Sequence, residues 1–98
     1  MLSERQKALY DAFYASTHQN EFLDSKTELL VGLAAAMGMN CLPCTRYYLQ
    51  KCQAQGVKRE EVGEVLAKVM AVAAGQKRLQ TQGVLAELKS EFADYWQE

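Results

Sequence analysis

Apolar residues recur at helical spacing along most of this chain, and no segment alternates apolar and polar residues as a strand would. A capping-box pattern from Ser3 to Gln6 marks the start of a first helix, predicted over residues 4–17. Ninety-eight residues are enough for one domain with one core. The sequence therefore predicts a single all-α domain over residues 1–98.

The predicted second helix follows another capping-box pattern, from Ser25 to Glu28, and ends near Gly38. This helix is apolar nearly all round, a composition typical of a helix that is buried on more than one side. A small domain has little interior to bury it in, and Gly32 would let another helix approach closely. We therefore expect the helix at an interface between identical subunits.

Three more helices are predicted, about five in all. The third ends near Gln55, with Gly56 as its C-terminal stop, and the fourth opens at Lys58. Its expected buried face comprises Val62, Val65, Leu66, Val69, Met70 and Ala73. Gly75 or Gly83 is expected to divide it from a fifth helix. The apolar positions of that last helix are Leu85, Leu88, Phe92, Tyr95 and Trp96.

Charge and composition exclude several classes of partner. The formal net charge is -1 and the basic residues are scattered, so neither nucleic acid nor an anionic membrane is an expected partner. The longest uncharged run, residues 29–45, is interrupted by glycine and proline, which argues against a membrane span. The N-terminus has no apolar leader, and the three cysteines are an odd number. These features predict a cytoplasmic protein with working thiols.

Two of those cysteines, Cys41 and Cys44, flank Pro43, the only proline, at the predicted start of the third helix. Proline is tolerated there because first-turn amides lack intrahelical partners. Positions three apart on a helix have Cβ atoms about 5–6 Å apart, so a modest tightening would allow a disulfide. The free N–H groups and the helix dipole stabilise a thiolate in at least one of the pair. This combination predicts redox chemistry.

The cysteines also allow two other interpretations. A zinc site would use Cys41, Cys44, Cys52 and His18, but Cys52 lies about 12 Å further along a continuous helix. Ligands about 2.3 Å from one zinc ion cannot be so far apart, so no metal or cofactor is expected. Alternatively, both motif cysteines are small packing residues. Cys52 itself is expected in the core.

His18 and Glu28 each have a purely structural and a functional interpretation. His18, the only histidine, lies in a polar break between helices, where it is either a solvated surface residue or a base that reaches the cysteines. Glu28 is either the N3 member of its capping box or a carboxylate that serves as base or proton relay. The relay interpretation requires the second and third helices to fold back antiparallel.

The segment from Glu28 to Gly75 resembles the carboxymuconolactone decarboxylase/alkylhydroperoxidase D (AhpD)-like family. The resemblance rests on a Glu-Leu-Leu start, an alanine-rich helix, the CxxC motif and the segment from Gly56 through Lys58 that follows. It implies an all-helical fold and a homo-oligomer such as a trimer or hexamer. It further implies that Cys44 attacks a peroxide, that Cys41 resolves the sulfenic acid, and that Glu28 belongs to a proton relay.

The sequence departs from the family pattern near the motif. Tyr48 stands where the relay histidine is found, four residues after the second cysteine, and Pro43 replaces another histidine. The gap from Glu28 to Cys41 is one residue longer than usual. A tyrosine with a pKa near 10 cannot act as a general base at neutral pH, although it can donate a hydrogen bond. Disulfide exchange survives this loss better than fast peroxide reduction.

The sequence thus predicts an AhpD-like thiol oxidoreductase that reduces peroxides or exchanges disulfides as a homo-oligomer. The expected catalytic residues are Cys41, Cys44, Glu28 and Tyr48. A thiol reductant must regenerate the dithiol, and the sequence does not identify it. Two alternatives stay open: a helical scaffold or small-molecule binding module that has lost the chemistry, and, as a minor one, a carboxymuconolactone decarboxylase.

Overall fold

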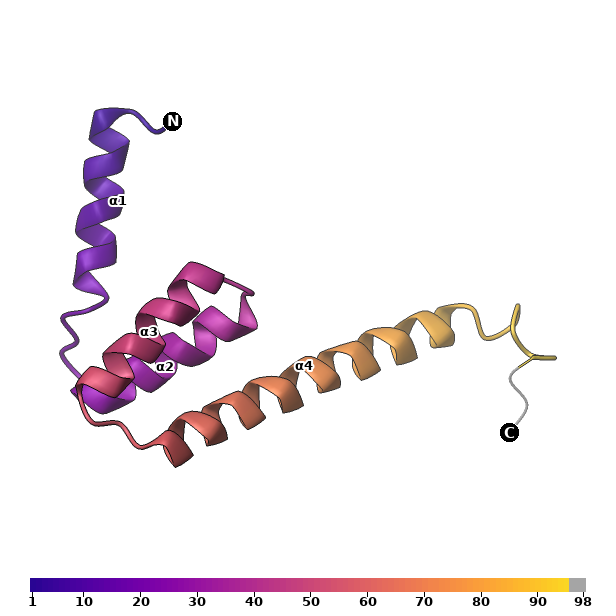
Figure 1. Ribbon diagram of the computed structural model, residues 1–98. Coiled ribbons are helices and arrows are strands. Elements are labelled where there is room, and N and C mark those ends of the chain that lie inside the picture. The colour runs from indigo at the N-terminus through magenta and orange to yellow at the C-terminus, as the bar shows by residue number, and fades with distance from the viewer. Residues whose placement is uncertain (96–98) are drawn as a thin grey trace.

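The computed structural model describes residues 1–95, which contain four helices and no strand. The helices are α1 (Glu4–Ser16), α2 (Ser25–Gly38), α3 (Leu42–Ala54) and α4 (Arg59–Glu87). Helices α2 and α3 lie side by side as an antiparallel hairpin, while α1 stands away from it at one end and α4 extends beyond it (Figure 1). The all-α prediction is confirmed.

The N-terminus of α2 differs from the predicted capping box. Asp24 is the N-cap, and its carboxylate Oδ1 accepts a hydrogen bond of 2.7 Å from the N–H of Thr27. Ser25 is already the first helical residue, so the predicted box from Ser25 to Glu28 is wrong. An aspartate caps a helix as well as a serine does. The shift by one residue releases the carboxylate of Glu28 from any capping role.

A tight turn joins α2 to α3. Asn40 adopts the left-handed conformation (φ 58°), and the N–H of Cys41 donates to the carbonyl of Ala36 at 2.9 Å. Asparagine tolerates this region better than most residues. The turn sends α3 back along α2, as the relay interpretation of Glu28 required. At the other end of α3, Gly56 (φ 73°) is the stop that the sequence predicted.

Helix α4 is one continuous helix of 29 residues, so the predicted division at Gly75 or Gly83 is wrong. A glycine inside a helix costs only about 1 kcal/mol relative to alanine, and the hydrogen bonds of the neighbouring turns tolerate it. After Glu87 the chain forms turns up to Tyr95, and Trp96 lies outside the described residues. The start of α4 is tied to the start of α2 by an ion pair between Glu61 and Lys26.

The buried core of residues 1–95 lies within the hairpin. Its members are Leu29, Leu33, Ala36 and Cys52. Partly buried apolar side chains pack around it: Leu30, Met37, Tyr48, Val57, Val62 and Val65. Neither α1 nor α4 buries a residue. The face predicted as buried on α4 is therefore only half right, because Leu66 and Met70 are 47% and 62% exposed.

The chain is far from compact. Its radius of gyration is 19.6 Å, against about 13 Å for a compact domain of this length. Its accessible surface is 8513 Å², against about 5,600 Å² for a folded monomer of 11.0 kDa. The excess is about 2,900 Å², and neither α1 nor α4, which extend from the hairpin, buries a residue. Large apolar side chains exposed on these two helices include Leu9, Phe13, Tyr14, Leu66, Met70, Val72, Leu79 and Val84.

No helix in residues 1–95 combines the length and the apolar character needed to cross a membrane.

Candidate functional site

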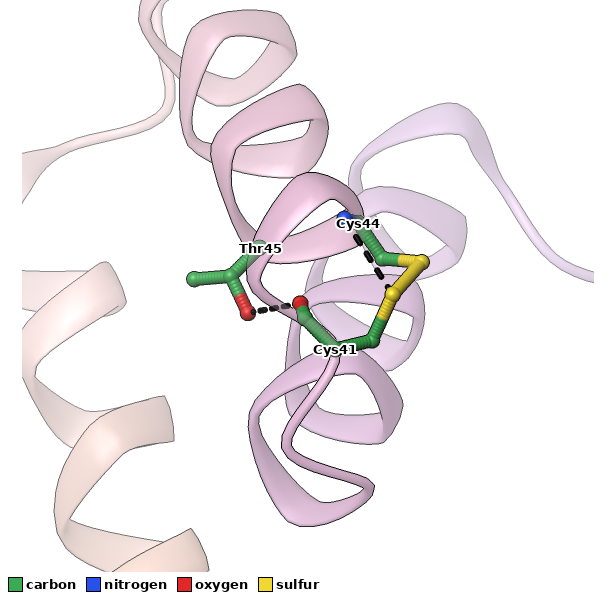
Figure 2. Close-up of a disulfide and its surroundings, with 3 residues drawn as sticks. All are labelled: Cys41, Cys44 and Thr45. Carbon is green, nitrogen blue, oxygen red and sulfur yellow. Dashed lines mark hydrogen bonds between the residues drawn. A yellow bond between two sulfur atoms is a disulfide. The ribbon is translucent and has the colours of Figure 1, made fainter.

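Cys41 and Cys44 are joined by a disulfide at the N-terminus of α3, with their Cα atoms 5.2 Å apart (Figure 2). Cys41 is the N-cap, with extended backbone angles (φ −91°, ψ 97°), and its Sγ accepts a hydrogen bond of 3.3 Å from the N–H of Cys44. The carbonyl of Cys41 accepts two hydrogen bonds of 2.9 Å from Thr45, one from N–H and one from Oγ1. The helix start thus fixes the geometry of both sulfur-bearing residues.

The sulfurs are accessible. Cys44 is exposed and Cys41 is partly buried. Two neighbouring apolar side chains, Met39 and Leu42, are also exposed, at 79% and 75%. The cysteine pair therefore lies at the surface of the chain.

Tyr48 follows Cys44 by one helical turn and lies on the same side of α3. Its phenol ring packs against Gly32 of α2, where a methyl group in place of the glycine hydrogen would overlap ring atoms Cε1 and Cζ. Burial raises the pKa of the Tyr48 hydroxyl, and the nearby carboxylate of Glu28 raises it further, followed by Tyr14 and Tyr47. At neutral pH this phenol is a hydrogen-bond donor and not a base.

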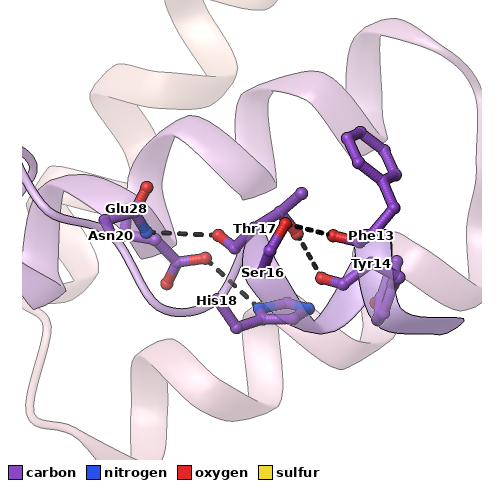
Figure 3. A network of polar contacts seen from close by, with 7 residues as sticks. All are labelled: Phe13, Tyr14, Ser16, Thr17, His18, Asn20 and Glu28. Carbon is purple, nitrogen blue, oxygen red and sulfur yellow. Dashed lines mark hydrogen bonds and ion pairs between the residues drawn. The ribbon is translucent and has the colours of Figure 1, made fainter.

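Glu28 faces His18. The Nδ1 atom of His18 lies 3.4 Å from Oε1 of Glu28, and the two side chains are only 24% and 16% exposed (Figure 3). His18 comes from the loop over residues 17–24, which carries it back to the first turn of α2. The interpretation of His18 as a solvated surface residue is therefore wrong. The structure places His18 beside Glu28 and away from the two motif cysteines.

Aromatic rings surround His18. The ring centroids of Tyr14, Tyr47 and Tyr48 lie 4.7, 5.9 and 6.4 Å from that of the imidazole. Among the described residues, the Nε2 atom of His18 is buried and has no hydrogen-bond partner. The cluster joins α1, the loop, α2 and α3. A pocket of about 280 Å³ opens beside it. Its lining consists of His18, Gln19, Asn20, Leu23, Ser25, Glu28, Leu29 and Gln55.

The antiparallel hairpin does not bring Glu28 to the disulfide. Glu28 lies in the first turn of α2, whereas the disulfide follows the end of that helix, about 15 Å further along its axis. Tyr48 lies between them, since it is one turn from Cys44 and within electrostatic reach of Glu28. The four predicted residues therefore form a row along the hairpin, with the sulfurs at one end and the carboxylate at the other.

Cys52 belongs to the core, as predicted. It is 1% exposed and packs with Leu29 and Leu33. Burial and, to a smaller extent, the carboxylate of Glu28 raise the pKa of its thiol, so it is a poor nucleophile. Across residues 1–95, no three His, Cys, Asp or Glu side chains are grouped so that they could hold a metal ion. The zinc interpretation therefore has no site in this part of the chain.

Two features of the site were not predicted from the sequence. One is the aromatic cage that Tyr14 and Tyr47 form around His18, which depends on contacts between segments distant in the chain. The other is the contact at Gly32, which was expected to let another helix approach closely. That helix is α3 of the same chain, and the group that packs on Gly32 is the ring of Tyr48. A glycine inside an otherwise apolar helix signals close packing, but it does not identify what packs there.

Comparison with known proteins identifies a family for the chain. A sequence model of the carboxymuconolactone decarboxylase family matches residues 5–87, which include all four helices except the first residue of α1. No curated protein matches the chain. No solved structure matches it either. Because the match covers most of the chain and includes the cysteine pair, the protein belongs to the carboxymuconolactone decarboxylase family.

Proposed function

We propose that the protein is a thiol oxidoreductase of AhpD-like type, which cycles Cys41 and Cys44 between dithiol and disulfide. The observation that carries the proposal is the accessible disulfide at the N-terminus of α3, in a chain of this family. Oxidation of the pair transfers two electrons to the substrate. A peroxide is reduced to an alcohol and water, or a disulfide to two thiols. An external thiol reductant then returns the pair to the dithiol.

The surroundings of the pair favour disulfide exchange over peroxide reduction. Tyr48 is the titratable side chain one turn from Cys44, and its raised pKa keeps it protonated at neutral pH. The loss of a positioned base costs on the order of 10²–10⁴ in rate for reactions that need one. Exchange with a disulfide needs an accessible thiolate and a thiolate leaving group, and it proceeds without such a base.

We further propose that the protein works as a homo-oligomer, such as a trimer or hexamer. The support is the excess surface of about 2,900 Å² relative to a folded monomer of this mass, which is in the range of obligate interfaces. Much of it is apolar and lies on α1 and α4. Light scattering during gel filtration tests this proposal, and a monomer at micromolar concentration would contradict it.

The redox proposal is tested by exposing the reduced protein separately to hydrogen peroxide and to a small disulfide. We expect the mass to fall by two hydrogens, and a peptide map to place the new bond between Cys41 and Cys44. The Cys52→Ala variant serves as the control and should behave as the wild type. Unreacted or overoxidised cysteines without an internal disulfide would contradict the proposal.

A second candidate is a scaffold or small-molecule binding module that has kept the fold and lost the chemistry. The observation that favours it is Tyr48, a protonated phenol where a base was expected. Alkylation rates separate the two functions. If neither Cys41 nor Cys44 reacts faster than a reference thiol of pKa about 8.5, the scaffold is the correct function. Turnover of a lactone carboxylate would instead support the decarboxylase alternative.

A further inference from the structure

Cys41 and Cys44 occupy unequal positions at the start of α3, although they share one disulfide. Cys41 is the N-cap residue, so its Sγ lies over the first turn and accepts the N–H of Cys44 at 3.3 Å (Figure 2). Within residues 1–95, no hydrogen bond is donated to the Sγ of Cys44. Cys44 instead sits inside the helix and contributes its own N–H to its partner.

Hydrogen bonds that do not involve sulfur hold the backbone of Cys41 in its N-cap conformation. The carbonyl of Cys41 accepts from both the N–H and the Oγ1 of Thr45 at 2.9 Å, and the N–H of Cys41 donates to the carbonyl of Ala36. Reduction of the disulfide removes none of these bonds, so we expect the backbone of Cys41 to stay extended. From this N-cap backbone, the Sγ of Cys41 can reach the free N–H groups of the first turn, where a negative charge is stabilised.

Pro43 reduces the number of N–H groups in the first turn that can donate to the Sγ of Cys41. It stands at the second helical position, and proline has no N–H, so the amide of Cys44 is the side-chain-capping donor that remains. That donor is directed at Cys41. The geometry therefore stabilises one thiolate selectively, and it is the thiolate of the first cysteine.

We propose that Cys41 is the attacking thiolate and Cys44 the resolving thiol, and that the substrate is a disulfide. This inference rests on the proposed redox function and reverses the order of attack implied by the family resemblance. In the first step, the sulfur of Cys41 attacks a substrate disulfide, forms a mixed disulfide and releases one substrate thiolate. In the second, Cys44 loses its proton to solvent and attacks the sulfur of Cys41, which releases the other substrate thiolate.

The preference for a disulfide follows from the leaving groups. A substrate thiolate leaves without being protonated, because its conjugate acid has a pKa near 8.5. An alkoxide or hydroxide leaving from a peroxide is a much stronger base and needs a proton donor beside the attacking sulfur. The ring of Tyr48 packs on Gly32 of α2. Along α3, Tyr48 lies one turn from Cys44 and two turns, about 10 Å, from Cys41, so Cys44 is the nearer cysteine.

The test uses two matched variants of the full-length chain, Cys41→Ser/Cys52→Ala and Cys44→Ser/Cys52→Ala. Each reduced variant is treated with iodoacetamide from pH 5.5 to 9 and with a chromogenic aromatic disulfide. Circular dichroism confirms that both are folded. The variant that retains Cys41 should be alkylated at least about tenfold faster at pH 6.5 than the variant that retains Cys44. It should also form a stable mixed disulfide in stoichiometric amount.

Two arms then identify the source of the disulfide, with Cys52→Ala as the enzyme. One arm contains a small aliphatic disulfide and the other contains insulin, a protein disulfide. Reduction in either arm, with peroxide at least about tenfold slower, supports the inference and names the source. Fast reaction of Cys44 with slow reaction of Cys41, or faster peroxide than disulfide reduction, would overturn it while leaving the redox function intact. Slow reaction of both cysteines would refute the proposed function itself.

Discussion

The imidazole of His18 and the carboxylate of Glu28 face each other at 3.4 Å, although one belongs to a loop and the other to the first turn of α2. Both side chains are mostly buried, and Figure 3 shows the ring of His18 directed towards the carboxylate. The pair fastens the loop over residues 17–24 to the hairpin. It also places two titratable groups behind Tyr48, on the side away from the sulfurs.

We expect the His18–Glu28 pair to be energetically coupled. The groups that face His18 are Glu28 from α2, Tyr14 from α1, and Tyr47 and Tyr48 from α3. The two side chains are in contact and mostly buried, so the contribution of each to stability should depend on the presence of the other. A double-mutant cycle with His18→Gln and Glu28→Gln, followed by urea unfolding, measures it. We expect a coupling of about 0.5–1.5 kcal/mol.

The control for this cycle is the ion pair between Lys7 and Asp11, whose side chains are 70% and 57% exposed. Exposed pairs at helical spacing contribute little to stability and are screened by salt. Their coupling should be close to zero. Equal coupling in the two cycles would show that the contact at 3.4 Å is energetically unimportant.

Substitution of Gly32 should displace Tyr48. Gly32→Ala places a methyl group against the phenol ring, and overpacking of this kind typically costs about 1–3 kcal/mol. The matched control is Gly63→Ala in α4, where no atom lies near the new methyl group and helix propensity favours alanine by up to about 1 kcal/mol. Combining Gly32→Ala with Tyr48→Ala should restore part of the loss. Additive effects in chemical denaturation would contradict the predicted contact.

The free energy of unfolding should fall as the pH rises above about 9. Burial, with a smaller contribution from Glu28, raises the pKa of the Cys52 thiol, so the folded state keeps a proton that the unfolded state has lost. Stability therefore decreases with pH once the unfolded thiol ionises. Cys52→Ala should flatten this alkaline slope between pH 8.5 and 10, measured by urea unfolding with the dithiol alkylated. An unchanged slope would exclude Cys52 as its cause.

Tyr48 contributes a second alkaline loss for the same reason. Burial and Glu28 raise the pKa of its hydroxyl, so the folded state holds the phenolic proton above about pH 10 while the unfolded state releases it. Tyr48→Phe in the Cys52→Ala background should remove the slope that remains above pH 10. Tyr47→Phe, which alters the neighbouring tyrosine, should reduce this slope less than Tyr48→Phe does. A remaining slope unaffected by Tyr48→Phe would argue against this assignment.

Tyr48→His should raise the rate of peroxide reduction. It introduces, one turn after Cys44, a side chain that accepts a proton at neutral pH. This base should convert Cys44 from a resolving thiol into a thiolate that attacks peroxide, and such a base typically contributes on the order of 10²–10⁴ in rate. Tyr47→His provides the control, since it adds the same group at the neighbouring position of α3. The measurement is peroxide consumption coupled to a thiol reductant. Equal rates in both variants would mean that no base can act from position 48.

Local signals in the sequence were sufficient for the hairpin. Gly56 stops α3 as predicted, and Pro43 is accommodated in the first turn, because both effects depend on backbone geometry over a few residues. Glycines inside α4 were misleading, since the residues around Gly75 are good helix formers and continue the helix. A propensity of about 1 kcal/mol cannot by itself end a helix.

The arrangement of the site depends on contacts that local patterns do not encode. Placing the N-cap at Asp24 instead of Ser25 changes the interpretation of Glu28, from a capping residue to a partner of His18. Which side chain fills the space above Gly32 is decided by the register of α2 against α3. The sequence thus pointed to the four residues that form the row along the hairpin, from the two cysteines to Glu28. That His18 is the partner of the Glu28 carboxylate became clear only from the fold.

The small core of the hairpin has a consequence for the behaviour of the protein in solution. Only four side chains among residues 1–95 are buried, and the fully buried ones are Leu33 and Cys52. A single copy with so few residues removed from water has little to offset its conformational entropy. We therefore expect mass action to govern folding, so that the thermal midpoint rises with protein concentration. On dilution, we expect the chain to unfold as the subunits of the proposed homo-oligomer separate. The redox pair would then lose the helix that positions it.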